Sequence, residues 1–301
     1  MKQSNNQNTT LAAARYAISS VLLDYGLLIK IRLTSVVVLS SALGYLIAAG
    51  SSANLRSFIL IILGGFFVTS AANALNQVFE KDFDSLMLRT SNRPLAAGRM
   101  RTAEAVLFAG LSCLAGILIL ATFNPITAIL GMVSLVLYAF VYTPMKRYST
   151  MAVAIGAIPG ALPVLIGFTA HEGTISAFGM GLFVLQFLWQ FPHFWSIGYV
   201  SFDDYQRAGF KLLPVVNDQI DRNLGLSSMF YSVLTIPVIG LLFLYGLVHI
   251  YSAIFCIVLS VIYIFLAFEF HRKFDRKSAL MLMFYSFVYL PLLLLTILLL
   301  G

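Results

Sequence analysis

Residues 279–300 read ALMLMFYSFVYLPLLLLTILLL, a run of 22 residues without a single charged side chain. Four basic residues stand just before it, at Arg272, Lys273, Arg276 and Lys277. As an α-helix, a run of this length rises about 33 Å, enough to cross the roughly 30 Å hydrocarbon core of a bilayer. The sequence therefore predicts a transmembrane helix here, with a basic flank on one side of the membrane.

Eight further apolar blocks precede this one, separated by charged or polar breaks. Even the short break at Asn124-Pro125 can turn the chain, because proline disfavours helix at the residue before it. We therefore predict an all-α integral membrane protein, a bundle of nine transmembrane helices. The expected ranges are Leu33–Ala49, Phe58–Leu75, Ala105–Phe123, Pro125–Tyr142, Met151–Ala170, Ser176–Tyr199, Met229–Val248, Ser252–Phe268 and Ala279–Leu300.

The composition excludes several other classes of protein. Of 301 residues, 60% are hydrophobic and 10% charged, whereas a soluble domain carries about a quarter charged residues. Cys113 and Cys256 lie singly inside apolar blocks, which excludes a disulfide framework or zinc site and favours a packing role. The net charge of +7 could suggest nucleic acid, but the positions of the charges favour a lipid bilayer and no nucleic-acid partner.

The basic residues gather in connections that would share one side of the membrane. Eighteen of the 19 Lys and Arg residues fall there, and only Arg56 falls on the other side. The positive-inside rule makes that side cytoplasmic, so we expect a cell inner membrane, a cytoplasmic N-terminus and a C-terminus on the opposite side. Residues 1–24 are expected to form a polar tail and surface segment without a cleaved signal peptide, and residues 25–301 one transmembrane domain. The stretch Leu11–Ile31 is mildly amphipathic and is expected to lie along the inner surface.

A polar stretch follows the second block and reads Asn76-Gln-Val-Phe-Glu80-Lys-Asp82-Phe-Asp84. If the helix continues through it, the spacing of four residues places Asn76, Glu80 and Asp84 on one stripe. Like charges at that spacing repel each other, so either a bound cation or a solvated helix end explains the pattern. Magnesium suits it, because Mg²⁺ binds one or two carboxylates together with substrate phosphates. We predict that these three residues hold Mg²⁺ and have a catalytic role.

Basic residues stand close to this stripe. Arg89 and Arg93 follow within about ten residues, and a guanidinium binds phosphate oxygens through paired contacts. Lys146, at the inner end of the fourth block, adds a third cation, and Tyr142 could face a developing carbocation. We predict that the three cations bind a diphosphate and that Tyr142 is catalytic. The alternatives are membrane topology alone for the arginines and an interfacial position for the tyrosine.

The connection after the sixth block holds a second set of polar residues. Asp203 and Asp204 are predicted to bind a second metal ion, and Lys211 to contact phosphate. Adjacent acids do not share a helical face, so a helix cap is the alternative.

One histidine of four, His193, lies well inside a predicted span. An ionisable ring there is costly, and such groups are functional candidates. His193 is predicted to bind substrate, either through a polar group or through haem iron, and a structural role is the alternative. Trp189 and Trp195 flank it and are predicted to line a flat aromatic pocket, unless they mark the membrane interface.

In combination these segments resemble the UbiA-type intramembrane prenyltransferases. The matching patterns are Asn-x-x-x-acid-x-x-x-Asp at 76–84, Arg-Thr-x-x-Arg-Pro-Leu at 89–95 and Tyr-x-x-x-Lys at 142–146. The resemblance covers nearly the whole chain from about residue 25. Two departures stand out: Glu80 replaces the aspartate of many members, and the second loop lacks their Asp-x-x-x-Asp pattern.

Two further segments, 189–195 and 204–214, are similar to those of family members that act on haem. The resemblance implies that haem B, farnesyl diphosphate and water give haem O and diphosphate, with Mg²⁺ as cofactor. One alternative is prenylation of an aromatic quinone precursor by a related enzyme. The other is cation-coupled transport, which should place its polar groups near the middle of the membrane.

Overall fold

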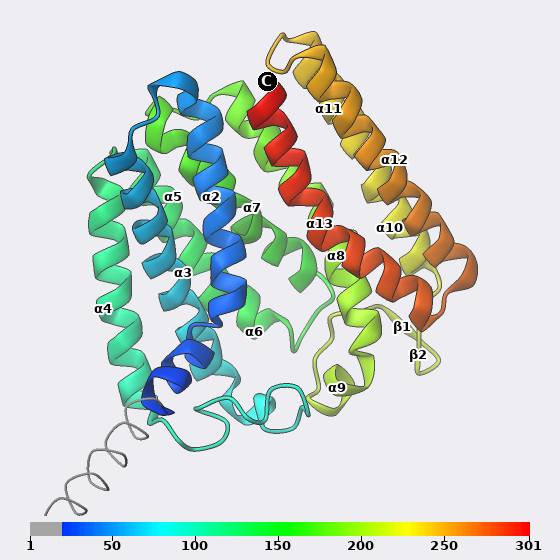
Figure 1. Ribbon diagram of the computed structural model, residues 1–301. Coiled ribbons are helices and arrows are strands. Elements are labelled where there is room, and N and C mark those ends of the chain that lie inside the picture. Colours follow the sequence, from blue (N-terminus) through cyan, green and yellow to red (C-terminus); the bar gives the residue numbers. More distant parts are fainter. Residues whose placement is uncertain (1–19) are drawn as a thin grey trace, which may run out of the picture.

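The computed structural model describes residues 20–301, and these fold into a bundle of long helices (Figure 1). The first half contains α2 (Ile31–Ala49), α3 (Leu55–Asp84), α4 (Thr102–Ala121), α5 (Pro125–Val136) and α7 (Ala152–Glu172). The second contains α8 (Ala177–Val200), α10 (Asn223–Val233), α11 (Thr235–Leu244), α12 (Ile250–Lys273) and α13 (Arg276–Leu300). Between them lie the short helices η1 (Gly50–Ser52), η2 (Leu137–Tyr142), α6 (Thr143–Met145) and α9 (Phe202–Arg207), and a hairpin of β1 (Val215–Val216) and β2 (Gln219–Ile220).

The predicted all-α membrane fold is confirmed. By length and composition, eight segments of residues 20–301 can cross a membrane, with α5 to α6 and α10 to α11 each counted as one. The remaining predicted span, Ser176–Tyr199, corresponds to α8, which has 24 residues but is not among those eight. Gln186, Gln190 and His193 lie within this helix and reduce its hydropathy.

Helix boundaries differ from the predicted ones mainly where a helix leaves the apolar block. The helix α3 runs nine residues past the predicted end at Leu75, to Asp84. The seventh span begins at Asn223 rather than Met229 and is broken between α10 and α11. At the expected turn, Pro125 is the first residue of α5, and the Asn124 side chain caps it by accepting from the Thr127 N–H. Residues 11–19 of the predicted surface stretch Leu11–Ile31 fall outside the described residues, and 20–28 are helical.

Close backbone contact sets the position of α2 against α7. A Cβ built at Gly167 would lie 1.8 Å from the Ser41 carbonyl oxygen, and one at Gly44 would lie 2.2 Å from the Val164 oxygen. Only a residue without a side chain permits this approach, and small residues are how membrane helices pack without a hydrophobic driving force. The helix α7 therefore occupies the centre of the bundle, buried along most of its length.

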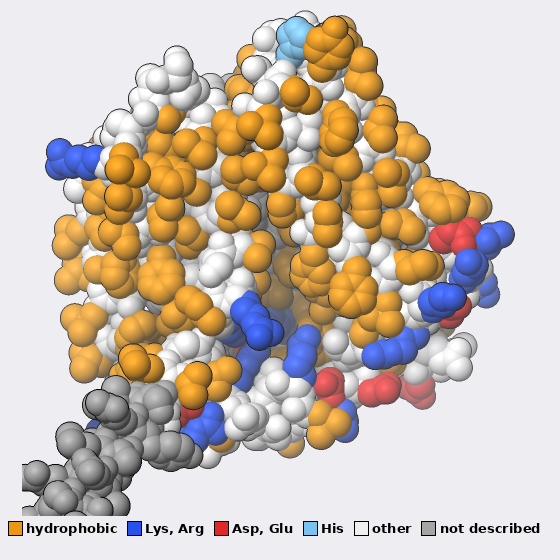
Figure 2. Space-filling view, in the orientation of Figure 1, with side chains coloured by type: hydrophobic (Ala, Val, Ile, Leu, Met, Phe, Trp, Pro, Cys, Tyr) orange, Lys and Arg blue, Asp and Glu red, His pale blue; other side chains and the backbone are white. Residues whose placement is uncertain are grey.

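The two ends of the bundle differ in charge. One end, the lower one in Figure 1, carries the connections 85–101, 146–151, 201–222 and 274–275. We call it the basic end, because Lys and Arg side chains gather along it in Figure 2. The same view shows a hollow in the apolar surface between α2 and α13, with basic side chains at its lower edge.

Candidate active site

The extension of α3 beyond the apolar block brings its acids to the basic end without exposing them. Glu80 is 3% exposed and Asp84 1% exposed, and Asn76 is fully buried. A solvated helix end would leave these side chains in water, so that alternative does not fit the geometry. Buried carboxylates need partners, and each has one from another segment of the chain.

Two ion pairs compensate the acids. The Lys146 Nζ lies 2.8 Å from the Glu80 Oε1. The Arg93 Nη1 donates to both oxygens of Asp84, at 2.8 and 2.7 Å. Lys146 is 66 residues from Glu80 in the sequence, so this pair exists only in the folded bundle, whereas Arg93 reaches back nine residues to Asp84 from the connection after α3.

Asn76 joins this cluster through both ends of its amide. Its Nδ2 donates to the Thr143 hydroxyl at 2.9 Å, and its Oδ1 accepts from the Lys30 Nζ at 2.5 Å. Burial and the neighbouring Arg93 lower the pKa of Lys30 well below its ordinary value, despite the opposing effect of Glu80. An anion bound beside Lys30 would raise its pKa again. We call Lys30, Asn76, Glu80, Asp84, Arg93 and Lys146 the charged layer.

Glu80 and the neighbouring tyrosines both stabilise the positive charge of Lys146. Burial acts to lower its pKa, but Glu80 and the neighbouring tyrosines raise it above the ordinary value. Its Nζ also lies 4.5 Å from the centre of the Tyr142 ring, within the range of a cation–π contact. Tyr142 ends the π-helical turn η2, a distortion that is frequent at functional sites.

The other predicted phosphate contacts lie further out. Arg89 is on the exposed connection after α3, where its Nη2 donates to the Tyr205 hydroxyl at 3.0 Å. Lys211 is exposed, and only its backbone N–H reaches the layer, donating to the Lys146 carbonyl at 2.6 Å. The structure thus brings Arg93 and Lys146 together at the acids, with Arg89 and Lys211 at the rim.

The predicted second metal site has a different setting. Asp203 and Asp204 lie in the first turn of α9, and Asp204 is ion-paired with Arg207 three residues later. Asp203 is exposed. Both predictions remain untested, and neither aspartate lies in the charged layer.

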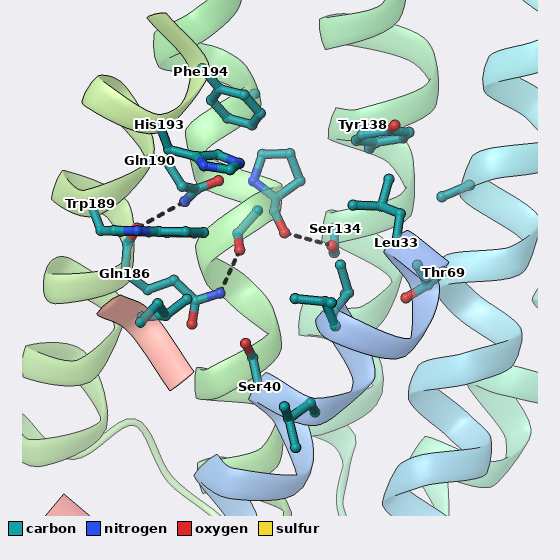
Figure 3. Close-up of a pocket in the computed structure, with 18 of the residues that line it drawn as sticks. Leu33, Ser40, Thr69, Ser134, Tyr138, Gln186, Trp189, Gln190, His193 and Phe194 are labelled. Carbon is teal, nitrogen blue, oxygen red and sulfur yellow. Dashed lines mark hydrogen bonds between the residues drawn. The ribbon is translucent and has the colours of Figure 1, made fainter. Parts of the chain in front are cut away.

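An apolar cavity of about 460 Å³ lies within the bundle. The charged layer does not line it, but Tyr142 does, and the centre of its ring lies 4.5 Å from the Lys146 Nζ. Asn73, Tyr138 and Tyr142 line it near the layer, and Arg32 lines it from the start of α2. Figure 3 shows Gln186, Gln190 and His193 reaching from one helix toward Ser134 and Tyr138 on the facing wall. The volume lies in the range of about 300–1,000 Å³ that small-molecule sites occupy.

The two predicted aromatic residues differ in their surroundings. Trp189 lines the cavity and is stacked on His193, with ring centres 4.7 Å apart. Trp195 packs against Phe191 and Tyr231 and is not among the cavity-lining residues. The geometry therefore supports a substrate contact for Trp189 and His193 but gives no such support for Trp195.

Sequence reasoning missed several residues of this region. Lys30 was used only for topology, because nothing in the sequence pairs it with Asn76. Gln186 and Gln190 were also missed but carried a signal, since they lie seven and three residues before the predicted His193 and share one helical face with it. A polar stripe inside an apolar block indicates a buried site.

The donor set of the layer fits a magnesium ion that shares its ligands with a substrate. Among residues 20–301, no three His, Cys, Asp or Glu side chains lie close enough to hold a metal by themselves. Two carboxylates and one amide oxygen are present, which suits Mg²⁺ because it keeps open positions for water and phosphate oxygens.

Comparison with known proteins identifies the family of this chain. The profile of the UbiA prenyltransferase family matches residues 37–288. The protoheme IX farnesyltransferase of Cytophaga hutchinsonii is 40% identical over 89% of this chain and 93% of its own. That of Flavobacterium johnsoniae is 38% identical over 92% of this chain and 94% of its own.

Solved structures share the fold. A structure of digeranylgeranylglyceryl phosphate synthase has a TM-score of 0.78 at 18% identity, covering 92% of this chain and 97% of that chain. A UbiA homolog from Archaeoglobus fulgidus bound to DMAPP and Mg²⁺ has a TM-score of 0.67 at 17% identity, covering 89% and 99%. From the family match and the relatives together, we conclude that this multi-pass membrane protein is a member of the UbiA prenyltransferase family.

Proposed function

We propose that this protein transfers a farnesyl group from farnesyl diphosphate to a vinyl group of haem B, with addition of water, giving haem O and diphosphate. The proposal rests on similarity along nearly the whole chain to proteins named protoheme IX farnesyltransferase. The observation that carries it in the structure is a buried charged layer whose Lys146 contacts Tyr142, a residue that lines an apolar cavity.

The charged layer is suited to a diphosphate. It holds three cations, Lys30, Arg93 and Lys146, against two carboxylates. An incoming diphosphate would take hydrogen bonds from Arg93 and Lys146, and the acids released from these pairs would be free for a metal ion. This exchange of partners keeps buried charges compensated before and after binding, which limits the cost of desolvation.

Magnesium is part of the proposal, with Asn76, Glu80 and Asp84 as the residues that would hold it. When bound, Mg²⁺ neutralises charge on the leaving diphosphate. A second ion at Asp203 and Asp204 stays a prediction, as do phosphate contacts by Arg89 and Lys211.

The reaction needs no nucleophilic side chain. The bond between the farnesyl C1 and the diphosphate oxygen breaks, and its electron pair leaves with the diphosphate. The haem vinyl group forms a carbon–carbon bond to C1, and water adds to the resulting cation and releases a proton. Preorganised cations act where negative charge develops, and the Tyr142 ring stands beside them to stabilise positive charge.

The cavity would hold the apolar parts of both substrates. Its walls are mostly aliphatic and aromatic side chains of α2, α3, α8 and α13, which bind a farnesyl chain through burial of apolar area. An apolar enclosure also limits premature capture of the allylic cation by water.

The test supplies membranes containing the protein with haem B and farnesyl diphosphate, with and without magnesium, and identifies haem products by mass. We expect haem O only when both substrates and Mg²⁺ are present, and a chelator should abolish its formation until Mg²⁺ is restored. When hydroxybenzoate is also supplied, a prenylated acid with unaltered haem would overturn the proposal in favour of a quinone-precursor enzyme.

We further propose an inner-membrane location with a cytoplasmic basic end, which the distribution of basic residues supports. The N-terminus would then be cytoplasmic and the C-terminus on the opposite side. Alkaline phosphatase fused after Gly301 should be active, because this enzyme works only outside the cytoplasm. An inactive fusion, with an active one in the 274–275 connection, would show the reverse orientation.

A further inference from the structure

His193 is held in a fixed position on the wall of the cavity. Its ring is stacked on Trp189, with an angle of 21° between the planes. The ring of Phe287 from α13 meets it nearly edge-on, at 83° and 5.0 Å between centres. Contacts on two sides restrict rotation of the imidazole, so its nitrogens point in defined directions.

The hydrogen bonds around His193 favour one tautomer of the ring. The Ser286 hydroxyl oxygen lies 2.6 Å from the Met283 carbonyl and 2.7 Å from the Nδ1 of His193. When the hydroxyl donates its one hydrogen to the carbonyl, it accepts from Nδ1–H, and the neutral ring then has a free electron pair on Nε2.

This Nε2 has no hydrogen-bond partner among residues 20–301. The residue is 9% exposed, and that exposure is to the cavity that it lines. The neighbouring amide nitrogens on this face of α8 are engaged, because the Nε2 atoms of Gln186 and Gln190 donate to the carbonyls of Gly160 and Ala157. The Oε1 of Gln186 is buried without a hydrogen-bond partner among the described residues. His193 thus presents the one unprotonated ring nitrogen of this wall.

We propose that the Nε2 of His193 is an axial ligand of the iron of the haem acceptor. The inference rests on the proposed function, because only a metalloporphyrin substrate brings iron to this cavity. A histidine that ligates a metal characteristically donates its other ring N–H to an oxygen acceptor, which orients the ring, and Ser286 fills that role here. Neutral imidazole is also a common axial ligand of haem iron.

Axial ligation would position the acceptor for the reaction. The electron pair of Nε2 lies in the imidazole plane, so the macrocycle would stand across the edge of the ring. The iron would be fixed on α8, while the diphosphate is held by the charged layer. Of the porphyrin edge, only the part that faces the layer could then receive the farnesyl group.

The experiment compares binding of haem B and of iron-free protoporphyrin IX to the purified full chain in detergent, without farnesyl diphosphate. Four proteins are used: wild type, His193→Gly, Ser286→Ala and the control His249→Ala, in which an exposed histidine at the opposite end is removed. We expect His193→Gly to weaken haem B binding by roughly 10- to 100-fold while leaving protoporphyrin IX binding unchanged. The wild-type ferrous complex should show an iron–histidine stretching band in its resonance Raman spectrum, and the variant should lack it.

Two further measurements separate ligation from packing. Added imidazole should restore a nitrogen-ligated spectrum to His193→Gly, because the vacated space would accept it, and Ser286→Ala should shift the iron–histidine band. An unchanged band in His193→Gly, or equal losses of haem B and protoporphyrin IX affinity, would overturn the proposal. Since no prenyl donor is present, a protein that binds haem through His193 but forms no haem O would refute the proposed function and not this ligand.

Discussion

Replacing Glu80 by glutamine would test whether the charged layer works as a set of compensated charges. The substitution keeps the shape of the side chain and one hydrogen bond to Lys146, but removes the negative charge. The side chains of this pair are 4% and 11% exposed, so water cannot compensate the remaining cation. Removing one partner of a buried ion pair typically costs about 3–5 kcal/mol, and we expect a loss of unfolding free energy near the lower limit because the hydrogen bond survives.

The same variant should depend on pH more steeply than the wild type. Burial lowers the pKa of Lys146, and Glu80 is the largest influence that raises it. Without that charge the pKa of Lys146 falls, so the amine loses its proton as the pH rises into the alkaline range. Because only the protonated amine can hold a diphosphate, turnover of Glu80→Gln should decline more with rising pH than wild-type turnover does.

The assay measures haem O formation from pH 6 to 10, together with thermal unfolding in detergent. Asp82→Asn is the matched control, since Asp82 lies two residues away on the same helix but is exposed. The double variant Glu80→Gln/Lys146→Met should regain part of the stability, because a neutral buried pair needs no counter-charge, but it should remain inactive. Equal stability of Glu80→Gln and wild type, or a flat pH profile in the variant, would refute this account of the layer.

Three further predictions concern the same region and the helix packing that supports it. Asp84→Ala should abolish haem O formation while the protein still fractionates with the membrane, and full turnover would contradict a metal-binding role. Arg93→Lys should raise the KM for farnesyl diphosphate about tenfold, since a lysine cannot reproduce the paired contacts of the guanidinium, and an unchanged KM would exclude Arg93 from the diphosphate site. Gly167→Ala should lower stability by about 1–3 kcal/mol through overpacking against Ser41. Its control is Gly110→Ala, where an added Cβ meets nothing within 4 Å, and equal melting temperatures for the two variants would contradict the packing explanation.

The membrane fold could be predicted from the sequence because length and apolarity alone define a span. The turn at Asn124-Pro125 was also predictable, since proline and a capping asparagine act through local geometry. The break between α10 and α11 was not, because it arises within a continuous apolar run. Hydropathy alone does not identify α8 as a span, because its glutamines reduce the mean hydropathy. They are tolerated there because they donate hydrogen bonds to carbonyls of α7, and such tertiary contacts are not visible in the sequence.

The candidate site was predictable in its parts but not in its pairing. Spacing along α3 correctly placed Asn76, Glu80 and Asp84 on one stripe, and the structure shows that this stripe is buried. Which cation faces which acid depends on the packing of α2, α3 and α6, and local sequence carries no signal for it. Lys30 is the clearest case, because its contact with Asn76 joins residues 46 apart in the sequence.

The placement of charge explains why the bundle can be both apolar and reactive. Glu80 and Asp84 of α3 are buried, so they are tolerated there only with Arg93 and Lys146 in place. Arg93 comes from the connection directly after α3, but Lys146 comes from the end of α6, so the pair with Glu80 forms only when α6 packs against α3. A diphosphate can compete for the same cations because it offers more acceptor oxygens than one carboxylate. The contacts that stabilise the resting layer are therefore the same contacts that the substrate would replace. In the proposed reaction, residues outside the apolar cavity would bind the leaving group, and residues that line it would hold the groups that are joined.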